Sequence, residues 1–149
     1  MKVFLDTSVL VASVLKTHPH HREGRSALDR VRAGEDAGFA SAHTLAETFS
    51  VLSRLPTKPK LDPESVLDIL ETDFIPHLSF IGLPATDYLP AIRDLVGMGL
   101  GGGRIYDVLH LRVAARLAPD RIYTFNETEW KKLSPELAPL ICAPPPPTA

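Results

Sequence analysis

The chain has 149 residues, of which 44% are hydrophobic and 23% are charged, and its formal net charge at pH 7 is −2. This size and composition predict one soluble globular domain, and the weak charge excludes a protein that binds nucleic acid through a strongly basic surface. The only cysteine, Cys142, cannot form an internal disulfide, and no apolar run approaches the length of a membrane span. We therefore expect a cytoplasmic protein that makes no contact with a membrane.

The first fifteen residues predict a buried strand, an acid and then a helix. Val3–Leu5 is a short apolar run suited to a core strand, and Val9–Leu15 continues with a helical pattern. Asp6 stands between them, so its carboxylate falls at the carboxyl end of the strand. That edge is where open α/β sheets bind their ligands. The acid also interrupts what would otherwise resemble a signal peptide, and no small-residue cleavage site follows.

Strands and helices alternate along the rest of the chain. Further strands are predicted over Phe39–Ser41, Leu78–Leu83, Arg121–Phe125 and Leu137–Cys142. Helices are predicted over His21–Ala33, Thr44–Leu55, Pro63–Phe74, Thr86–Val96, Arg104–Leu117 and Asn126–Lys132. This alternation predicts an α/β three-layer sandwich, with a central parallel sheet of four to five strands flanked by helices. Residues 1–142 form this single domain, and residues 143–149 form a proline-rich tail that we expect to be disordered.

Four polar residues share one structural setting, since Asp6, Glu47, Asp107 and Asn126 each lie in or beside the first turn of a predicted helix. Each also has a local explanation. Asp6 can cap the first helix, and Glu47 stands three residues after Thr44, as in a capping box. Asn126 begins a second pattern of that kind, and the helix dipole favours an anion at Asp107. The apolar neighbours of Asp107 leave little exposed helix surface, however, so an acid there needs a further reason.

Taken together, the three acids suggest a metal site. Carboxylates gathered at one sheet edge repel one another and raise each other's pKa unless a cation neutralises them. Mg²⁺ and Mn²⁺ prefer oxygen ligands, and such ions activate water for attack on a phosphodiester. An all-acid site at this edge therefore predicts metal-assisted phosphoester hydrolysis.

Four strings resemble, in order and spacing, the PIN-domain family, and most closely the toxin ribonucleases of VapBC-type toxin–antitoxin modules. They are Phe-Leu-Asp6-Thr-Ser-Val-Leu, Ala-His-Thr-Leu-Ala-Glu47-Thr-Phe-Ser-Val-Leu, Arg-Ile-Tyr-Asp107-Val-Leu-His-Leu and Tyr-Thr-Phe-Asn126-Glu-Thr-Glu-Trp130. The likeness extends from Met1 to about Cys142. No single string is specific, but the ordered set of four is.

The resemblance implies a Rossmann-like parallel sheet and a Mg²⁺- or Mn²⁺-dependent endoribonuclease with an RNA substrate, a cognate antitoxin and a homodimeric state. Asp6, Glu47 and Asp107 carry over as the acidic metal site, and together with Asn126 as the catalytic set. Asn126 stands where many members have a fourth acid, which brings a second tightly held metal into question. Thr124 in the same string is expected to hydrogen-bond within the site, as the family's Thr or Ser often does.

Two alternatives remain open at this stage. The chain can be an RNA-processing nuclease of the same family that has no antitoxin. It can also be a degenerate PIN domain that binds RNA or a protein without cleaving, a possibility that Asn126 keeps open. For the toxin hypothesis, the helices Thr44–Leu55 and Pro63–Phe74 offer a dimer or antitoxin surface, and a basic antitoxin side chain would be attracted into the acidic pocket.

Other features are expected to be structural. The glycine-rich segment 97–103 lacks the spacing of a phosphate-binding loop, so no nucleotide cofactor is predicted, and we expect a hinge. His110 is one turn from Asp107 and is expected to pack, although it can also support the acid. Thr17–His21 contains three histidines without the spacing of zinc ligands, which predicts a solvated loop. Phe125 and Trp130 are predicted to belong to the core rather than to form platforms on which bases stack.

Overall fold

A five-stranded parallel sheet forms the centre of the computed structural model, which describes residues 1–148. The strands are β1 (Lys2–Leu5), β2 (Ala37–Ser41), β3 (Leu78–Ile81), β4 (Arg121–Tyr123) and β5 (Ile141–Cys142). They pair in the order β3-β2-β1-β4-β5, and every pair is parallel. The chain therefore builds outward from β1 to β3, then crosses back to place β4 on the other side of β1. This sheet confirms the predicted α/β class and strand number.

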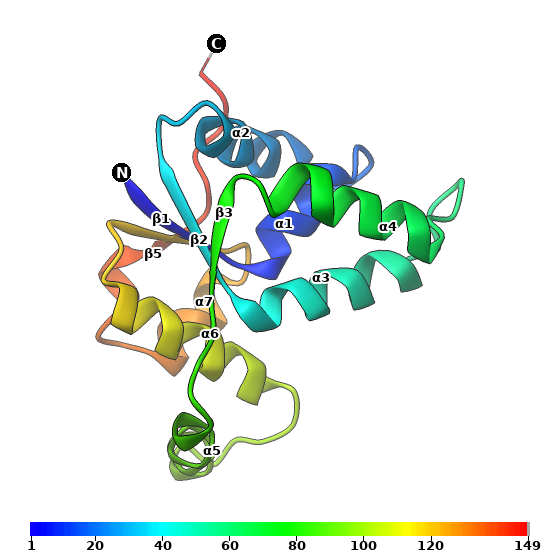
Figure 1. The fold of residues 1–149 in the computed structure, drawn as a ribbon. Helices are drawn as coiled ribbons and strands as arrows, with labels where there is room; N and C mark the ends of the chain where they lie inside the picture. The colour runs from blue at the N-terminus through cyan, green and yellow to red at the C-terminus, as the bar shows by residue number, and fades with distance from the viewer. Residues whose placement is uncertain (149) are drawn as a thin grey trace.

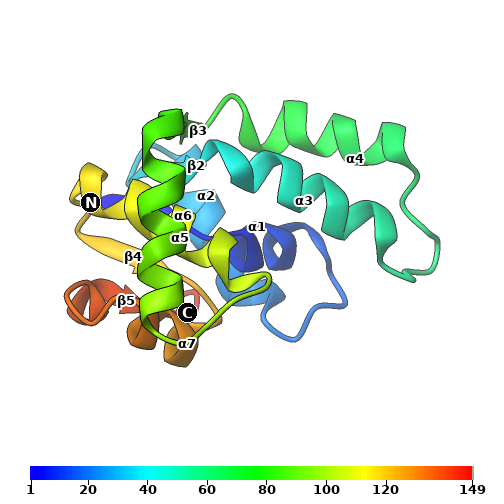
Figure 2. The same cartoon turned by 90° about the horizontal axis from the view of Figure 1, so that it is seen from below.

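Seven α-helices surround the sheet (Figure 1). They are α1 (Thr7–Val14), α2 (His21–Arg32), α3 (Ala42–Arg54), α4 (Pro63–Ile69), α5 (Tyr88–Gly97), α6 (Arg104–Leu117) and α7 (Glu127–Leu133). One hydrophobic cluster joins the sheet to α1 and α2, and a second joins it to α5, α6 and α7. A third, smaller cluster of Val11, Leu52 and Val66 joins α1 to α3 and α4. The first two clusters give the three-layer arrangement that the sequence predicts. Helix α5 packs on the outside of α6, away from the sheet (Figure 2).

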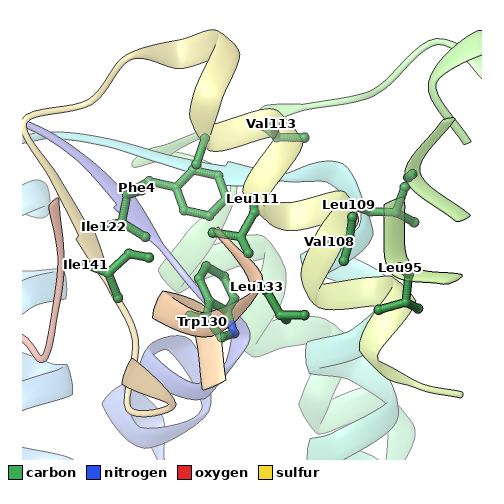
Figure 3. Packing of buried hydrophobic residues seen from close by; sticks show 12 residues of the cluster. Phe4, Leu95, Val108, Leu109, Leu111, Val113, Ile122, Trp130, Leu133 and Ile141 are labelled. Carbon is green, nitrogen blue, oxygen red and sulfur yellow. The ribbon is translucent and has the colours of Figure 1, made fainter. Parts of the chain in front are cut away.

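β1 is buried on both faces, which explains its unbroken run of apolar residues. Val3 and Leu5 belong to the cluster beneath α1 and α2, whereas Phe4 belongs to the cluster beneath α6. Figure 3 shows Phe4 packed near Leu111 and Ile122 on that second face. Side chains alternate between the faces of a strand, so a strand covered twice must be apolar at consecutive positions.

Several element boundaries differ from the predictions. The predicted last strand, Leu137–Cys142, is reduced to its final two residues, because Ala138–Leu140 forms a 3₁₀ turn. Pro139 has no N–H to give to a strand ladder, which accounts for the shorter strand. The predicted helix Pro63–Phe74 ends in a π-helical turn over Leu70–Phe74.

The tail after β5 has no regular secondary structure over residues 143–148, where Pro145, Pro146 and Pro147 lie beside α2. Ala149, the last residue of the predicted tail, lies outside the described residues. Within the described part of the chain, no helix is long and apolar enough to cross a membrane.

Candidate active site

The four singled-out residues line one pocket at the carboxyl edge of the sheet. Asp6, Glu47, Asp107 and Asn126 surround a hollow of about 200 Å³, together with His18 from the loop between α1 and α2. Asp6 follows β1 and Asn126 follows β4, so the pocket opens where the strand order reverses. A crevice of this kind is the usual ligand site of open parallel sheets.

Asp6 is almost completely buried, at 3% exposure, yet it faces no basic side chain at hydrogen-bond distance. Its Oδ2 accepts hydrogen bonds from Ser8 Oγ and Thr124 Oγ1, each at 2.8 Å. Asp6 occupies the N-cap position of α1, but its side chain makes no capping bond. The local explanation for this acid therefore fails, and its carboxylate is free to serve the pocket.

Burial raises the pKa of Asp6 above its usual value, and the neighbouring Glu47 charge adds to that shift. The positive form of His110 and the hydroxyl bonds from Ser8 and Thr124 oppose it without cancelling it. A carboxylate in this state gains strongly from any cation that enters. The predicted hydrogen bond of Thr124 within the site is present.

Glu47 is oriented by a buried histidine rather than by a capping box. Helix α3 begins earlier than predicted, with Ser41 as its N-cap, and the Ser41 hydroxyl accepts the Thr44 N–H. Glu47 Oε2 instead lies 3.1 Å from His110 Nε2 and 3.5 Å from His43 Nε2. Desolvation opposes ionisation of Glu47, but the bond and charge of His110 outweigh it and lower its pKa.

His110 is fully buried and connects two elements at the site. Its Nδ1 is hydrogen-bonded to Ser41 at the end of β2, while its Nε2 holds Glu47 on α3. The imidazole also stacks against Trp130, with ring centroids 6.1 Å apart. His110 thus packs in the core as predicted and supports an acid, although that acid is Glu47 and not its helical neighbour Asp107.

Asp107 is partly buried in the first turn of α6, where apolar neighbours surround it. Desolvation, followed by the charge of Asp6, raises its pKa to about 6, and Glu47 contributes in the same direction. Asp6 and Asp107 therefore have raised pKa values beside an ionised Glu47, an arrangement that a bound cation would stabilise.

Asn126 is exposed at the rim of the same pocket. It stands at the N-cap position of α7, as predicted, but its side chain makes no capping bond. Its backbone N–H instead donates to Thr124 Oγ1 at 3.0 Å. The amide is therefore available to a ligand, and it contributes an oxygen without a charge.

The donor set agrees with a hard divalent cation, although the carboxylates do not converge on one point. Among residues 1–148, no group of three or more histidine, cysteine or acidic side chains is arranged closely enough to hold an ion. Two buried polar atoms beside the acids lack a well-formed hydrogen bond, namely Thr7 Oγ1 near Glu47 and Trp130 Nε1 near Asp107. Unsatisfied donors and mutually repelling carboxylates are the chemistry that a cation and its waters would complete.

Three residues that contribute to the site were not predicted from the sequence. Ser8 donates to Asp6 and accepts the Phe125 N–H at 3.1 Å, so it joins the loops after β1 and β4. Ser41 fixes His110, and His18 reaches the pocket from a loop. The position of Ser8, two residues after the acid, was the only local signal. The other two contacts depend on how distant segments meet.

Comparisons with known proteins agree with this geometry. The family model described as PIN domain matches residues 3–134. Ribonuclease VapC27 of Mycobacterium tuberculosis (strain ATCC 25618 / H37Rv) is 34% identical over 111 residues, which cover 74% of this chain and 75% of that protein. Ribonuclease VapC40 of M. tuberculosis (strain CDC 1551 / Oshkosh) is 34% identical over 104 residues, covering 70% of this chain and 72% of that protein.

Two solved structures share the fold. The crystal structure of M. tuberculosis VapC20, a Sarcin-Ricin loop cleaving toxin, aligns with a TM-score of 0.68 at 17% identity, over 89% of this chain and 95% of VapC20. The structure of VapBC2 from Rickettsia felis bound to a promoter DNA fragment aligns with a TM-score of 0.59 at 24% identity, over 90% and 94% of the two chains. With the family model and the VapC relatives, these likenesses establish that the chain belongs to the PIN-domain family.

Proposed function

We propose that the chain is an endoribonuclease that hydrolyses RNA phosphodiester bonds with Mg²⁺ or Mn²⁺, and that it is the toxin of a type II toxin–antitoxin system. One observation carries the proposal: Asp6, Glu47 and Asp107, which the sequence singles out, line a single pocket at the strand-order reversal. Relatives that cover about three-quarters of the chain are named VapC ribonucleases, which supports the RNA substrate.

Asp6, Glu47 and Asp107 would hold the cation. A divalent ion bound there supplies charge for the attacked phosphate and lowers the pKa of a bound water. The chain's own task is to hold the acids in position. Ser8 and Thr124 fix the Asp6 carboxylate from two sides, and His110 fixes Glu47.

Asn126 limits the charge of the site to three carboxylates. Its amide oxygen lies at the pocket rim, where it would orient a water or a substrate hydroxyl. The loss of a fourth negative charge favours one tightly held metal over two. The same residue supports the second candidate function, a PIN domain that binds RNA or a protein without cutting.

An antitoxin and a second copy of the chain are the proposed protein partners. Phe49 on α3 and Leu67 on α4 are exposed apolar side chains beside the pocket's helices, suited to an apolar partner segment. Val11 and Val51 form the apolar part of the pocket wall. We propose that a basic antitoxin side chain reaches the acids, because their unbalanced charge attracts it. A complex whose pocket contains no cationic side chain would contradict this.

The test is RNA cleavage by the purified, antitoxin-free chain in Mg²⁺, Mn²⁺ or EDTA. Asp6→Asn keeps the shape of the site but removes one charge, and we expect cleavage to fall at least about a hundredfold. Asp68→Asn makes the same change at an exposed position on α4 and is expected to cleave like the wild type.

Each outcome has a separate meaning. Equal cleavage by wild type and Asp6→Asn would indicate a contaminating nuclease and would refute the assigned role. Absence of cleavage together with metal-independent RNA binding would favour the non-cutting candidate. Cleavage by a chain with no adjacent partner gene would favour an RNA-processing nuclease over a toxin.

A further inference from the structure

An aromatic cluster at the rim of the acidic pocket has no part in the chemistry described so far. His18 and His20 come from the loop between α1 and α2, and Phe125 follows β4. The rings of His20 and Phe125 are stacked, with centroids 4.5 Å apart and planes 13° from parallel. His18 lies against both, with centroid distances of 5.9 Å to His20 and 6.3 Å to Phe125.

The cluster holds the His20 ring in a fixed position while leaving it accessible. Phe125 packs against the hydrophobic core as predicted, and its backbone N–H is tied to Ser8 Oγ at 3.1 Å. The His20 N–H donates to His18 Nδ1 at 3.1 Å, which restrains the loop. His20 itself is exposed, and Phe125 stacks on one face of its ring, so the opposite face is the outer face of the stacked pair.

The aromatic cluster lies beside the acids. His18 belongs to the pocket wall, and Phe125 immediately precedes the pocket residue Asn126. Burial, followed by the charges of His20 and His21, lowers the pKa of His18. His18 is therefore neutral at neutral pH and adds an aromatic surface without adding a charge to the pocket.

We propose that the outer face of His20, supported by Phe125, is a stacking platform for an unpaired RNA base next to the bond that is cut. This rests on the proposed ribonuclease function. Any base can stack on an aromatic ring, whereas a duplex keeps its bases within its own stack. The platform therefore selects single-stranded or looped RNA and restrains the nucleotide whose phosphate enters the pocket.

Another position for the stacked base fits less well. A second stacked pair, His43 with Tyr106, also lies near the acids. His43 Nε2 lies 3.5 Å from Glu47 Oε2, so we assign this ring to positioning the carboxylate rather than to binding a base.

The platform is tested with single-stranded RNAs of about twelve nucleotides, in which 2-aminopurine occupies each position in turn, because stacking on an aromatic ring quenches its fluorescence. All variants carry Asp6→Asn so that the RNA stays intact. We expect His20→Ala to weaken binding about five- to tenfold and to abolish the quenching at one position. His20→Tyr keeps a ring and should retain both signals. His77→Ala removes a histidine beside β3 at the opposite edge of the sheet and should change neither.

A second readout separates the platform from a structural role. In the otherwise wild-type enzyme, His20→Ala should raise KM for a single-stranded substrate and leave kcat nearly unchanged. The stacked base stabilises the bound substrate and the transition state equally, so its loss weakens binding without slowing the chemical step. The platform is refuted if the His20→Ala protein binds single-stranded RNA and quenches 2-aminopurine as strongly as the Asp6→Asn parent does. It is also refuted if the parent, on binding duplex RNA, quenches 2-aminopurine as much as on binding single-stranded RNA. Failure of the wild type to cleave any RNA would instead refute the proposed function, and failure of the parent to bind would refute both.

Discussion

Asp6 is a buried carboxylate held by hydroxyl groups rather than by a cation. Ser8 in the first turn of α1 and Thr124 after β4 both donate to it, so this acid is fixed where the segments that follow two neighbouring strands pack together. Hydroxyl donors orient a carboxylate without neutralising it. The arrangement keeps a negative oxygen in place and leaves its charge to be balanced by whatever enters the pocket.

The pKa of Asp107 gives a pH-dependent test of this residue. Its value of about 6 lies above 3.8, so between these values the native state keeps a proton that the unfolded chain has lost. This group therefore makes the protein most stable at low pH, and the free energy of unfolding decreases as pH rises towards and beyond 6. We expect metal-free Asp107→Asn to be more stable than the wild type at about pH 7.5, by about 1 kcal/mol after allowance for solvent screening, but not at about pH 4.

Urea denaturation of both proteins in EDTA at the two pH values measures this difference. Mg²⁺ added at the higher pH should stabilise the wild type and have a smaller effect on the variant, because only the wild type retains all three acids. A stability difference that is the same at both pH values would contradict the raised pKa.

The three acids and the bond from Thr124 were predicted from the sequence, but the contact that orients Glu47 was not. Its local spacing fits a capping box with Thr44, whereas in the structure it bonds to His110, which lies far away in the chain. The choice depends on where α3 begins and on how α6 packs against it, and neither can be read from one segment. The same holds for His18, whose loop position is settled by contact with Phe125 after β4.

At the scale of elements, the close packing of α1 and α2 sets the position of the loop between them. A Cβ added at Gly24 of α2 would lie 3.0 Å from Ala12 Cβ, Ser13 N and Val9 O of α1. These contacts are tighter than ordinary packing, and two of the three atoms belong to the backbone. The two helices approach this closely only because position 24 has no side chain.

We expect Gly24→Ala to destabilise the protein by about 1–3 kcal/mol, even though alanine has the higher helix propensity. Gly97→Ala at the end of α5, where nothing lies within 4 Å of the added Cβ, is the matched control and should be neutral or stabilising by up to about 1 kcal/mol. Thermal denaturation compares the two. A stable Gly24→Ala protein would show that the helices can separate without cost.

Strong hydrophobic periodicity predicted which segments are helices and strands, but it predicted the first and last residues of those segments less well. Thr44–Leu55 was predicted as a helix and α3 is one, but its start lies at Ala42 because Ser41 supplies the cap. The last strand lost most of its predicted length to a 3₁₀ turn at Pro139. Both ends have a local cause that the hydrophobic pattern does not contain, namely a proline that cannot join a strand ladder and a serine that caps a helix.

For the whole molecule, alternation of elements predicted a parallel sheet but not the strand order. The order β3-β2-β1-β4-β5 places Asp6 beside Thr124, which lies 118 residues later in the chain. The pocket exists only because the connection after β3 returns to the far side of β1. The family resemblance implied a Rossmann-like parallel sheet, and neither it nor the periodicity predicted this order.

Among the helices of the described residues, α5 carries the most large apolar side chains that are exposed. Helix α5 packs on α6 with its inner side, and its outer side stands clear of the body (Figures 1 and 2). Five large apolar side chains in or beside it are at least 45% exposed, namely Tyr88, Leu89, Ile92, Val96 and Met98. Contiguous apolar surface of this kind favours self-association, and we expect the proposed homodimer to form through this face.

Val96→Glu places a charge on that face at its most exposed apolar side chain, since Val96 is 65% exposed in the single chain. Burying an unpaired carboxylate costs several kcal/mol, so we expect the dimer dissociation constant to rise at least about a hundredfold while the fold of the monomer is kept. Leu67→Glu makes the same change on α4, which we assign to the antitoxin, and should leave the dimer intact. Sedimentation velocity over a range of concentrations distinguishes them. If Leu67→Glu dissociates the dimer and Val96→Glu does not, the interface lies on α4, and α5 becomes the surface that the antitoxin must cover.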